Sequence, residues 1–215
     1  MSFEIIAIGV VLAYLIGSLP SAVWLGQAYH GIDVRDFGSG NAGATNTFRV
    51  LGKKAGILVM ALDIFKGLTA VTLATVWMQL GFIAESQIVL FKLIFGISAV
   101  LGHIFPVYVG FKGGKGVATL LGMVLGINPL VAAICIAVFM IVLLLTKYVS
   151  LGSILGTLTF PVMLLITNIE PNDEILKIFG FTFFVVVLVT HKKNLLRILN
   201  GTENKVNFPS RKNTD

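Results

Sequence analysis

Long apolar segments recur along the chain and are separated by short polar connections that hold most of the charged residues. Of the 215 residues, 56% are hydrophobic and only 12% are charged, whereas a soluble domain carries about a quarter charged residues. Roughly 20 consecutive apolar residues are enough for a helix to cross a bilayer. The sequence therefore predicts an all-α, polytopic integral membrane bundle.

Seven segments are expected to form transmembrane helices, some of them short. They comprise residues 3–27, 56–78, 88–108, 117–127, 130–146, 149–167 and 175–190. The first is expected to bend at residues 17–21, because Pro20 removes a helix hydrogen bond and clashes with the preceding turn. Asn128 and Pro129 are expected to separate the fourth helix from the fifth.

The charged residues predict which helix ends share a side of the membrane. Basic residues cluster at 35–54, 112–115 and 192–212, whereas 170–174 is acidic. Basic loops beside apolar spans mark the cytoplasmic side. An odd number of crossings must then separate 112–115 from the acidic turn, so the short segment 117–127 counts as one crossing. The N-terminus is expected outside and the C-terminus in the cytosol.

One membrane-embedded domain is expected over residues 1–203, followed by a polar, disordered cytosolic tail at 204–215. The net charge of +6 would suit nucleic acid, but the basic residues flank apolar spans, so no nucleic-acid partner is expected.

The single cysteine, Cys135, lies in an apolar run, and no His-Glu-x-x-His motif occurs. No metal and no cofactor are therefore expected, and the protein is expected to be a monomer.

The first polar motif reads Gly-Ser-Gly-Asn-Ala-Gly-Ala-Thr-Asn over residues 38–46. Glycines let peptide N–H groups surround an anion, and hydroxyl and amide side chains add further donors. The motif is therefore predicted to hold a phosphate at the membrane surface. Its candidate binding residues are Gly38, Ser39, Gly40, Asn41, Gly43, Thr45 and Asn46, and Arg49 follows them. The alternative is that the glycines only allow close helix packing.

The second motif is a basic, glycine-rich loop that follows the third apolar segment. It contains Lys112, Gly113, Gly114, Lys115 and Gly116. The spacing excludes a nucleotide-binding P-loop, because Gly116 stands where that motif requires serine or threonine. Two cations over a donor-rich backbone nevertheless suit a phosphate, although Lys112 fits a solvated positive-inside loop equally well. His103, which precedes the loop, is expected either to cap the bend structurally or to act in catalysis.

The third motif comprises His191, Asn194, Arg197 and Glu203. If the last span continues inward, His191 and Asn194 share a helix face because they are three residues apart. His191 is a candidate general base or phosphate ligand, and Asn194 a candidate oxyanion donor. The alternatives are a histidine that only marks the membrane interface and a glutamate in a solvated tail.

These motifs resemble those of the bacterial acyl-phosphate:glycerol-3-phosphate acyltransferases, the PlsY family. The matching runs are residues 38–46, Gly102-His103-x-x-Pro106 together with residues 111–119, and His191-x-x-Asn194-x-x-Arg197-x-x-x-Gly201-x-Glu203. They follow the family's order and span nearly the whole chain. Another class of glycerol-phosphate acyltransferase uses His-x-x-x-x-Asp, and no histidine in this chain has that spacing.

The resemblance implies a seven-helix enzyme of the bacterial inner membrane with its site on the cytosolic face. It implies transfer of a fatty acyl group from acyl phosphate to the 1-position of sn-glycerol 3-phosphate. The products would be lysophosphatidic acid and inorganic phosphate, in the first acylation step of phospholipid synthesis. The implied partners are these two substrates and membrane lipid.

By motif position, the resemblance also implies roles for individual residues. The implied catalytic residues are Ser39, Arg49, Lys115, His191 and Asn194. Gly43 and the glycines of the second motif would shape phosphate pockets, and Glu203 would be mainly structural. A small transporter for an anionic phosphorylated solute is the alternative, because glycine-rich broken helices also build transporter sites.

Overall fold

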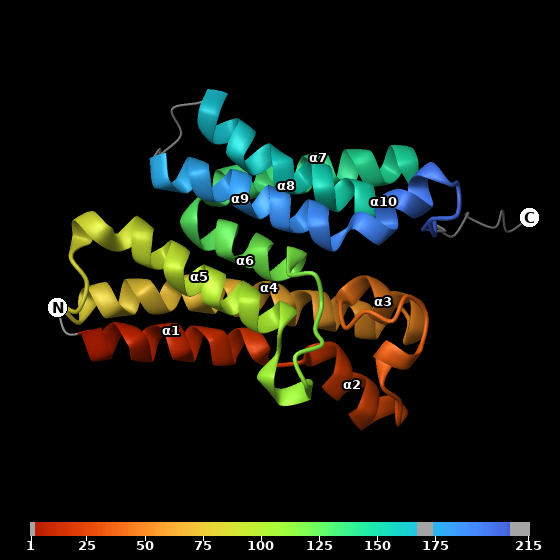
Figure 1. Ribbon diagram of the computed structural model, residues 1–215, viewed down its shortest axis with the longest axis horizontal. Helices are drawn as coiled ribbons and strands as arrows, with labels where there is room; N and C mark the ends of the chain where they lie inside the picture. The colour runs from red at the N-terminus through yellow and green to blue at the C-terminus, as the bar shows by residue number, and fades with distance from the viewer. Residues whose placement is uncertain (1–2, 167–173, 207–215) are drawn as a thin grey trace, which may run out of the picture.

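The computed structural model describes residues 3–166 and 174–206, and every regular element in those ranges is a helix (Figure 1). The α-helices are α1 Phe3–Ser18, α2 Ser21–His30, α3 Ala44–Val50, α4 Lys53–Gln79, α5 Ile88–Ile104, α6 Val117–Ile127, α7 Pro129–Thr146, α8 Val149–Ile166, α9 Glu174–Thr190 and α10 Lys192–Leu199. Three single 3-10 turns, η1 Val34–Asp36, η2 Glu85–Gln87 and η3 Val107–Val109, complete the described elements.

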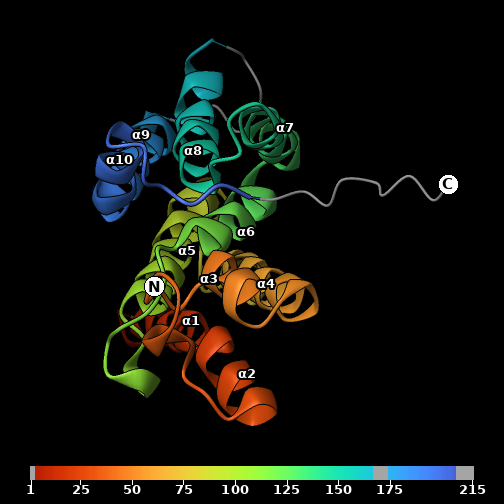
Figure 2. The ribbon, with the colours of Figure 1, turned by 90° about the vertical axis from the view of Figure 1, so that its right-hand side faces the viewer.

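The helices form two groups that meet along α5 and α6. In the first group α1 packs on α5 and α4, and in the second α8 packs between α7 and α9. Helix α6 lies against α4 and α5 on one side and against α7 on the other. Figure 2 shows this division, with α1, α2 and α4 on one side and α7, α8 and α9 on the other. The core therefore runs through the centre of the bundle, where Phe95, Leu93 and Met123 are fully enclosed.

The outer surface of the bundle is apolar, as lipid contact requires. Leu145, Ile166 and Phe65 are 80%, 71% and 63% exposed, and a helix that is apolar on all sides is typical of a membrane span. Among the described residues, five helical stretches are long and apolar enough to cross a membrane. The bent pair of α9 and α10 would make a sixth. The protein is thus an all-helical, multi-pass membrane protein.

The expected helices agree with the observed ones to within a few residues. Helix α6 occupies the predicted segment 117–127, and the first span breaks at Leu19 and Pro20 as expected. The last span ends at Thr190 as expected, and the chain then bends by 60° between α9 and α10, so α9 does not continue straight past His191. Most of the expected acidic turn, 170–173, and the tail beyond residue 206 lie outside the described residues.

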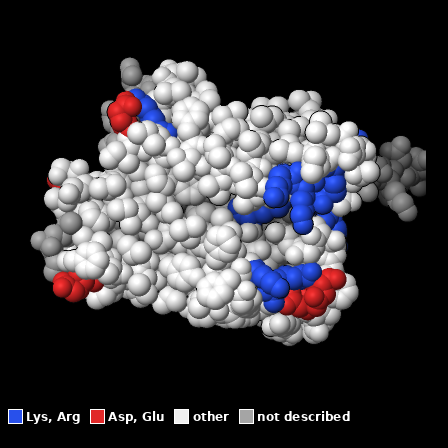
Figure 3. Space-filling view, viewed as in Figure 1, with Lys and Arg blue, Asp and Glu red and all other residues white. Residues whose placement is uncertain are grey.

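Most basic side chains gather at one end of the bundle. Figure 3 shows lysines and arginines near the end that carries α3 and α10. Acidic side chains lie both at this end and at the opposite end. The loop before α3, the loop before α6 and helix α10 are all at the basic end (Figure 1). The chain therefore brings the three polar sequence motifs to a common end of the molecule.

Helices α4 and α6 cross at glycines, which let the two backbones touch. A Cβ atom on Gly122 would lie 1.8 Å from the carbonyl oxygen of Ile64, and one on Gly67 would lie 1.9 Å from that of Thr119. Neither neighbour can move aside, since both are backbone atoms. Small residues at such crossings allow close van der Waals packing in membrane bundles, so this contact sets the position of α6 and of the loop before it.

Replacing Gly122 with alanine is expected to push α4 and α6 apart and destabilise the protein. Overpacking costs about 2 kcal/mol, which corresponds to a fall in Tm on the order of 5 °C for a chain of this size. Thermal unfolding of the detergent-solubilised protein measures the effect. Gly156→Ala is the matched control, because its Cβ would approach no atom closer than 3.2 Å. Equal Tm values for the two variants would contradict the packing argument.

Candidate active site

The first glycine loop folds around the side chain of Asn46, which is 1% exposed. Its Nδ2 atom donates to the carbonyl oxygens of Val34 and Phe37 at 2.7 and 3.1 Å, and its Oδ1 atom accepts from the backbone N and Oγ of Ser39 at 2.8 and 3.1 Å. These four bonds use both amide donors and both lone pairs of the side-chain oxygen. Asn46 was expected to bind substrate. Its side chain instead makes these four bonds within the protein and so fixes the shape of the loop.

The shaped loop presents its glycines and small polar groups at the surface. Gly38 and Gly40 have φ values of +62° and +70°, which residues with a Cβ atom rarely adopt. Ser39 and Thr45 are exposed, Asn41 and Gly43 are half-buried, and Arg49 projects from α3 with an exposed side chain. The loop thus offers donors to solvent while Asn46 holds its backbone from inside.

Arg35 ties the first loop to the second, a role that the sequence did not reveal. Its guanidinium contacts Asp33 at 2.7 Å, and its Nη1 atom donates to the carbonyl oxygens of Val109 and Lys112 at 2.9 and 3.2 Å. The side-chain hydrogen bond from Arg35 lowers the pKa of Asp33, so this carboxylate stays ionised. Only the Asp-x-Arg spacing hinted at the local pair, and nothing in the sequence indicated the contact with residues 109–112.

The second loop crosses the end of α5 and is fixed to it by backbone hydrogen bonds. The N–H groups of Gly113 and Gly114 donate to the carbonyl oxygens of Ile104 and His103, both at 3.1 Å. Gly116, with φ of +81°, turns the chain into α6. Lys112 is exposed, whereas Lys115 is half-buried and points toward α10.

Lys115 enters a hydrogen-bond network with the third motif. Its Nζ atom donates to Oδ1 of Asn194 at 2.5 Å, and Nδ2 of Asn194 donates to Oε1 of Glu203 at 2.6 Å. Nε of Arg197 donates to the other carboxylate oxygen of Glu203 at 2.7 Å. The structure therefore brings together Lys115, Asn194, Arg197 and Glu203, which the sequence placed in two separate motifs.

Ser150, at the start of α8, is a further member of this network that the sequence did not indicate. Its Oγ atom donates to Oε1 of Glu203 at 2.9 Å. A serine within an apolar segment gives no indication in the sequence that it contacts a distant carboxylate. The tail also touches this turn, because the N–H of Val206 donates to the carbonyl oxygen of Lys147 at 2.9 Å and the Lys205 ammonium lies 5.4 Å from the Tyr148 ring centre.

Burial and hydrogen bonding shift the proton affinities of two groups in the network. Burial lowers the pKa of Lys115 to about 8 despite the nearby Glu203 carboxylate. Burial alone would raise the pKa of Glu203, but hydrogen bonds from Arg197, Asn194 and Ser150 lower it overall. At neutral pH the site therefore holds an ionised carboxylate and an ammonium that can lose its proton in mildly alkaline solution.

His191 stands at the bend between α9 and α10 and is buried. Its Nδ1 atom lies 2.8 Å from the carbonyl oxygen of Val187. A carbonyl oxygen can only accept, so Nδ1 carries the proton and Nε2 has a free lone pair in the neutral ring. The N–H of Asn194 donates to the carbonyl oxygen of His191 at 2.8 Å, which places the histidine one turn from the network.

The first loop reaches the network only indirectly. Within residues 3–166 and 174–206, neither Ser39 nor Arg49 has a hydrogen bond to Lys115 or His191. Arg35 supplies the connection through the backbone of the second loop. In the same ranges no group of three His, Cys, Asp or Glu side chains is arranged to hold a metal ion. The described residues offer cations and backbone amides beside a histidine.

The known proteins to which this chain is similar in sequence are glycerol-3-phosphate acyltransferases. A family model described as glycerol-3-phosphate acyltransferase matches residues 7–201. The chain is 42% identical to the glycerol-3-phosphate acyltransferase of Chlorobium phaeobacteroides strain BS1, covering 96% of this chain and 98% of that protein. It is 45% identical to that of Staphylococcus saprophyticus, covering 94% and 98%.

Solved structures agree with this assignment. Two crystal structures of PlsY, an integral membrane glycerol 3-phosphate acyltransferase, are each 35% identical in sequence and cover 94% of this chain. The glycerol 3-phosphate form aligns over 96% of its chain with a TM-score of 0.80, and the lysophosphatidic acid form over 95% with a TM-score of 0.77. The chain therefore belongs to the glycerol-3-phosphate acyltransferase family, PlsY, and is a membrane-embedded acyltransferase.

Proposed function

We propose that the enzyme transfers a fatty acyl group from acyl phosphate to the 1-hydroxyl of sn-glycerol 3-phosphate, giving lysophosphatidic acid and inorganic phosphate. The observation that carries the proposal is the half-buried Lys115 ammonium, which Asn194 fixes in the second glycine-rich loop, while Arg35 joins that loop to the first. Two phosphate-bearing reactants require two cationic, donor-rich surfaces at one place. Family membership as an acyltransferase argues against the transporter alternative.

The solved relatives support the choice of acceptor and product. One PlsY structure is a glycerol 3-phosphate form and another a lysophosphatidic acid form. These two molecules differ by one acyl group on the glycerol, which is the change that the proposed reaction makes. Acyl phosphate fits as the donor because it is an activated mixed anhydride and its leaving group is itself a phosphate.

In the proposed reaction, the glycerol hydroxyl oxygen attacks the acyl carbon of the donor directly. The new ester C–O bond forms, the C–O bond to the phosphate breaks, and inorganic phosphate leaves with the bonding electron pair. Lys115, Arg49 and loop donors such as Ser39 stabilise the charge that develops on the oxygens. Holding both anions together supplies proximity. The hydroxyl proton passes either to Nε2 of His191 or to a phosphate oxygen of a substrate.

The remaining site residues have supporting roles in this proposal. Lys112 and Arg197 add positive charge, Glu203 orients Asn194, and the loop amides bind phosphate oxygens. The residues that contribute those amides or frame them are Gly38, Gly40, Asn41, Gly43, Thr45, Gly113, Gly114 and Gly116. No metal or organic cofactor is needed for this chemistry, because the donor is already activated.

We also propose seven membrane crossings, with α6 counted as one and α9 with α10 as the last. The N-terminus would be outside and the site would lie on the cytosolic face of a bacterial inner membrane, because the basic segments at residues 35–54, 112–115 and 192–199 occupy one end. A single domain would span residues 1–203 of a monomer. The expected tail begins at residue 204, and within it Lys205 and Val206 still contact Tyr148 and Lys147.

The donor can be tested with purified protein in detergent and glycerol 3-phosphate. Phosphate release and lysophosphatidic acid formation are expected with acyl phosphate and not with acyl-CoA or acyl carrier protein. Mass spectrometry of the lipid product and a phosphate assay measure the two products in equal amounts. Turnover with acyl-CoA, or none with any of the three donors, would overturn the proposal.

The charge on Lys115 predicts a pH dependence. A lysine with a pKa of about 8 is protonated below that pH and neutral above it, so kcat/KM for the free enzyme is expected to fall about tenfold per pH unit above pH 8. In Lys115→Arg the fall should disappear up to pH 10, because arginine stays charged. Initial rates at pH 6–10, corrected for acyl phosphate hydrolysis, provide the measurement. The exposed Lys53→Arg variant should keep the wild-type profile, and a Lys115→Arg profile identical to wild type would exclude this role.

The proton acceptor is tested by His191→Gln, which keeps a polar side chain but has no basic nitrogen. If Nε2 takes the hydroxyl proton, kcat is expected to fall by about 100-fold with a smaller change in KM. Steady-state kinetics between pH 6 and 9 separate the two constants. Near-full turnover at every pH would rule out the histidine and assign the proton to a substrate phosphate.

A further inference from the structure

Three ionisable side chains lie inside the bundle and take no part in the proposed chemistry. Asp63 and Lys66 of α4 and His103 of α5 are 2%, 4% and 7% exposed. Ionisable groups within a membrane span are costly and are retained where they have a function.

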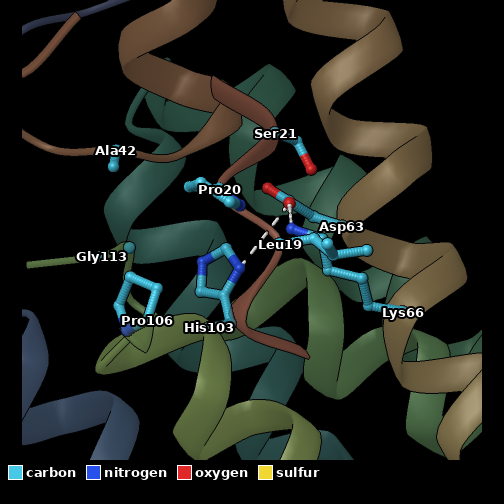
Figure 4. Close-up of a pocket in the computed structure, with 10 residues that line it drawn as sticks. Leu19, Pro20, Ser21, Ala42, Asp63, Lys66, His103, Pro106 and Gly113 are labelled. Carbon is cyan, nitrogen blue, oxygen red and sulfur yellow. Dashed lines mark hydrogen bonds and ion pairs between the residues drawn. The ribbon is translucent and has the colours of Figure 1, made fainter. Parts of the chain in front are cut away.

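The cluster is joined through a single carboxylate oxygen. Nζ of Lys66 lies 2.6 Å from Oδ1 of Asp63, and Nδ1 of His103 lies 3.6 Å from the same oxygen. Figure 4 shows the three side chains converging beside Pro20 and Ser21, at the break between α1 and α2. A cavity of about 10 Å³ is lined by these three side chains together with Ala42 of the first loop and Gly113 and Gly114 of the second.

His103 is the member that touches the second loop. A Cβ atom on Gly114 would lie 2.2 Å from Nε2 of His103, so the glycine backbone rests directly on the imidazole ring. The carbonyl oxygens of His103 and Ile104 accept hydrogen bonds from Gly114 and Gly113. The imidazole therefore has Asp63 on one edge and the backbone of the loop on the other.

Lys115 follows immediately after this supported glycine. Its ammonium must reach Asn194 across the interface between the two helix groups. A change in the height or tilt of the Gly113–Gly114 peptide would move the lysine side chain by a similar amount. Misplacing a binding group by about 1 Å can cost on the order of 100-fold in rate, so the support beneath the loop matters for the reaction.

We propose that Asp63, Lys66 and His103 form a buried positioning cluster that fixes the Gly113–Gly114 backbone and thereby sets the place of the Lys115 ammonium. Lys66 holds the Asp63 carboxylate, Asp63 orients the imidazole, and the imidazole supports the loop. None of the three touches the reacting atoms. The inference deepens the proposed function and rests on it for its kinetic consequences, but the contact with the loop stands independently.

The first test removes the charges together, because deleting one partner of a buried ion pair leaves an unpaired charge and is strongly destabilising, whereas replacing both by apolar residues is often tolerated. The full-length variant Asp63→Leu/Lys66→Met, purified in detergent, is expected to keep a Tm close to wild type. Its KM for at least one of acyl phosphate and glycerol 3-phosphate should rise about tenfold or more. The control is Lys92→Met on α5, whose lysine donates to the carbonyl oxygen of Gly126 at 3.3 Å and lies outside the cluster, and it should show wild-type constants.

The second test leaves the Asp63–Lys66 pair intact and so remains informative if the double variant does not fold. His103→Ala removes the support beneath Gly114 and should raise KM in the same way. His103→Gln carries an amide that reaches the position of Nε2, and it should restore a substantial part of the loss. Gly114→Ala should impair the wild-type protein through its clash with the ring and be better tolerated in the His103→Ala background.

Amide hydrogen exchange provides a readout that does not depend on the reaction. The N–H groups of Gly113 and Gly114 should exchange at least tenfold faster in His103→Ala and in the double variant, while peptides from α7 and α8 stay unchanged. If the wild-type protein has no activity with acyl phosphate, the proposed function fails and exchange alone decides the positioning claim. Folded variants with wild-type KM, kcat and exchange, or with a lower Tm but unchanged kinetics and exchange, would overturn it.

Discussion

The arrangement of the candidate site depends on the hydrogen bonds that the Glu203 carboxylate accepts. This carboxylate accepts hydrogen bonds from Ser150 of α8 and from Asn194 and Arg197 of α10, and Asn194 in turn accepts from Lys115 before α6. Helices α8 and α10 therefore meet at one ionised group, and Lys115 joins them through Asn194. Because hydrogen bonds are stronger in a low-dielectric environment and unpaired groups are costly there, this network holds the two helix groups in a fixed relation at the basic end.

Glycine-rich loops need such external support, because they lack side chains that could hold them in place. Asn46 holds the first loop from inside, and Arg35 fastens it to the carbonyl oxygens of the second. The close crossing of α4 and α6 at Gly67 and Gly122 fixes the helix that the second loop enters. The contacts that position the loops are made on their protein-facing side, so the backbone N–H groups on the other side can face a ligand.

Much of the fold follows from the local sequence. The length of apolar segments predicted the helices, including α6 at residues 117–127, and Pro20 predicted the break between α1 and α2. The polar motifs were recognisable because clustered glycines and amides have no reason to occur in a membrane span unless they serve packing or binding. The family assignment from these motifs is confirmed by known relatives.

Two of the missed features depend on contacts between residues distant in sequence. Arg35 meets residues more than 70 positions away, and Ser150 meets Glu203 more than 50 positions away. The bend at His191 was also missed, because the apolar pattern of α9 carries no signal for a change of direction. Asn46 looked like a ligand donor by composition, and only its four filled hydrogen bonds revealed that it shapes the loop.

The most direct test of the account is a structure of this protein with glycerol 3-phosphate bound. The phosphate is expected to lie within hydrogen-bond distance of the Lys115 ammonium or of amides in residues 38–43 or 112–116, with the 1-hydroxyl directed toward His191. A phosphate bound at the opposite end of the bundle, or one that leaves both glycine loops and Lys115 without contact, would contradict it.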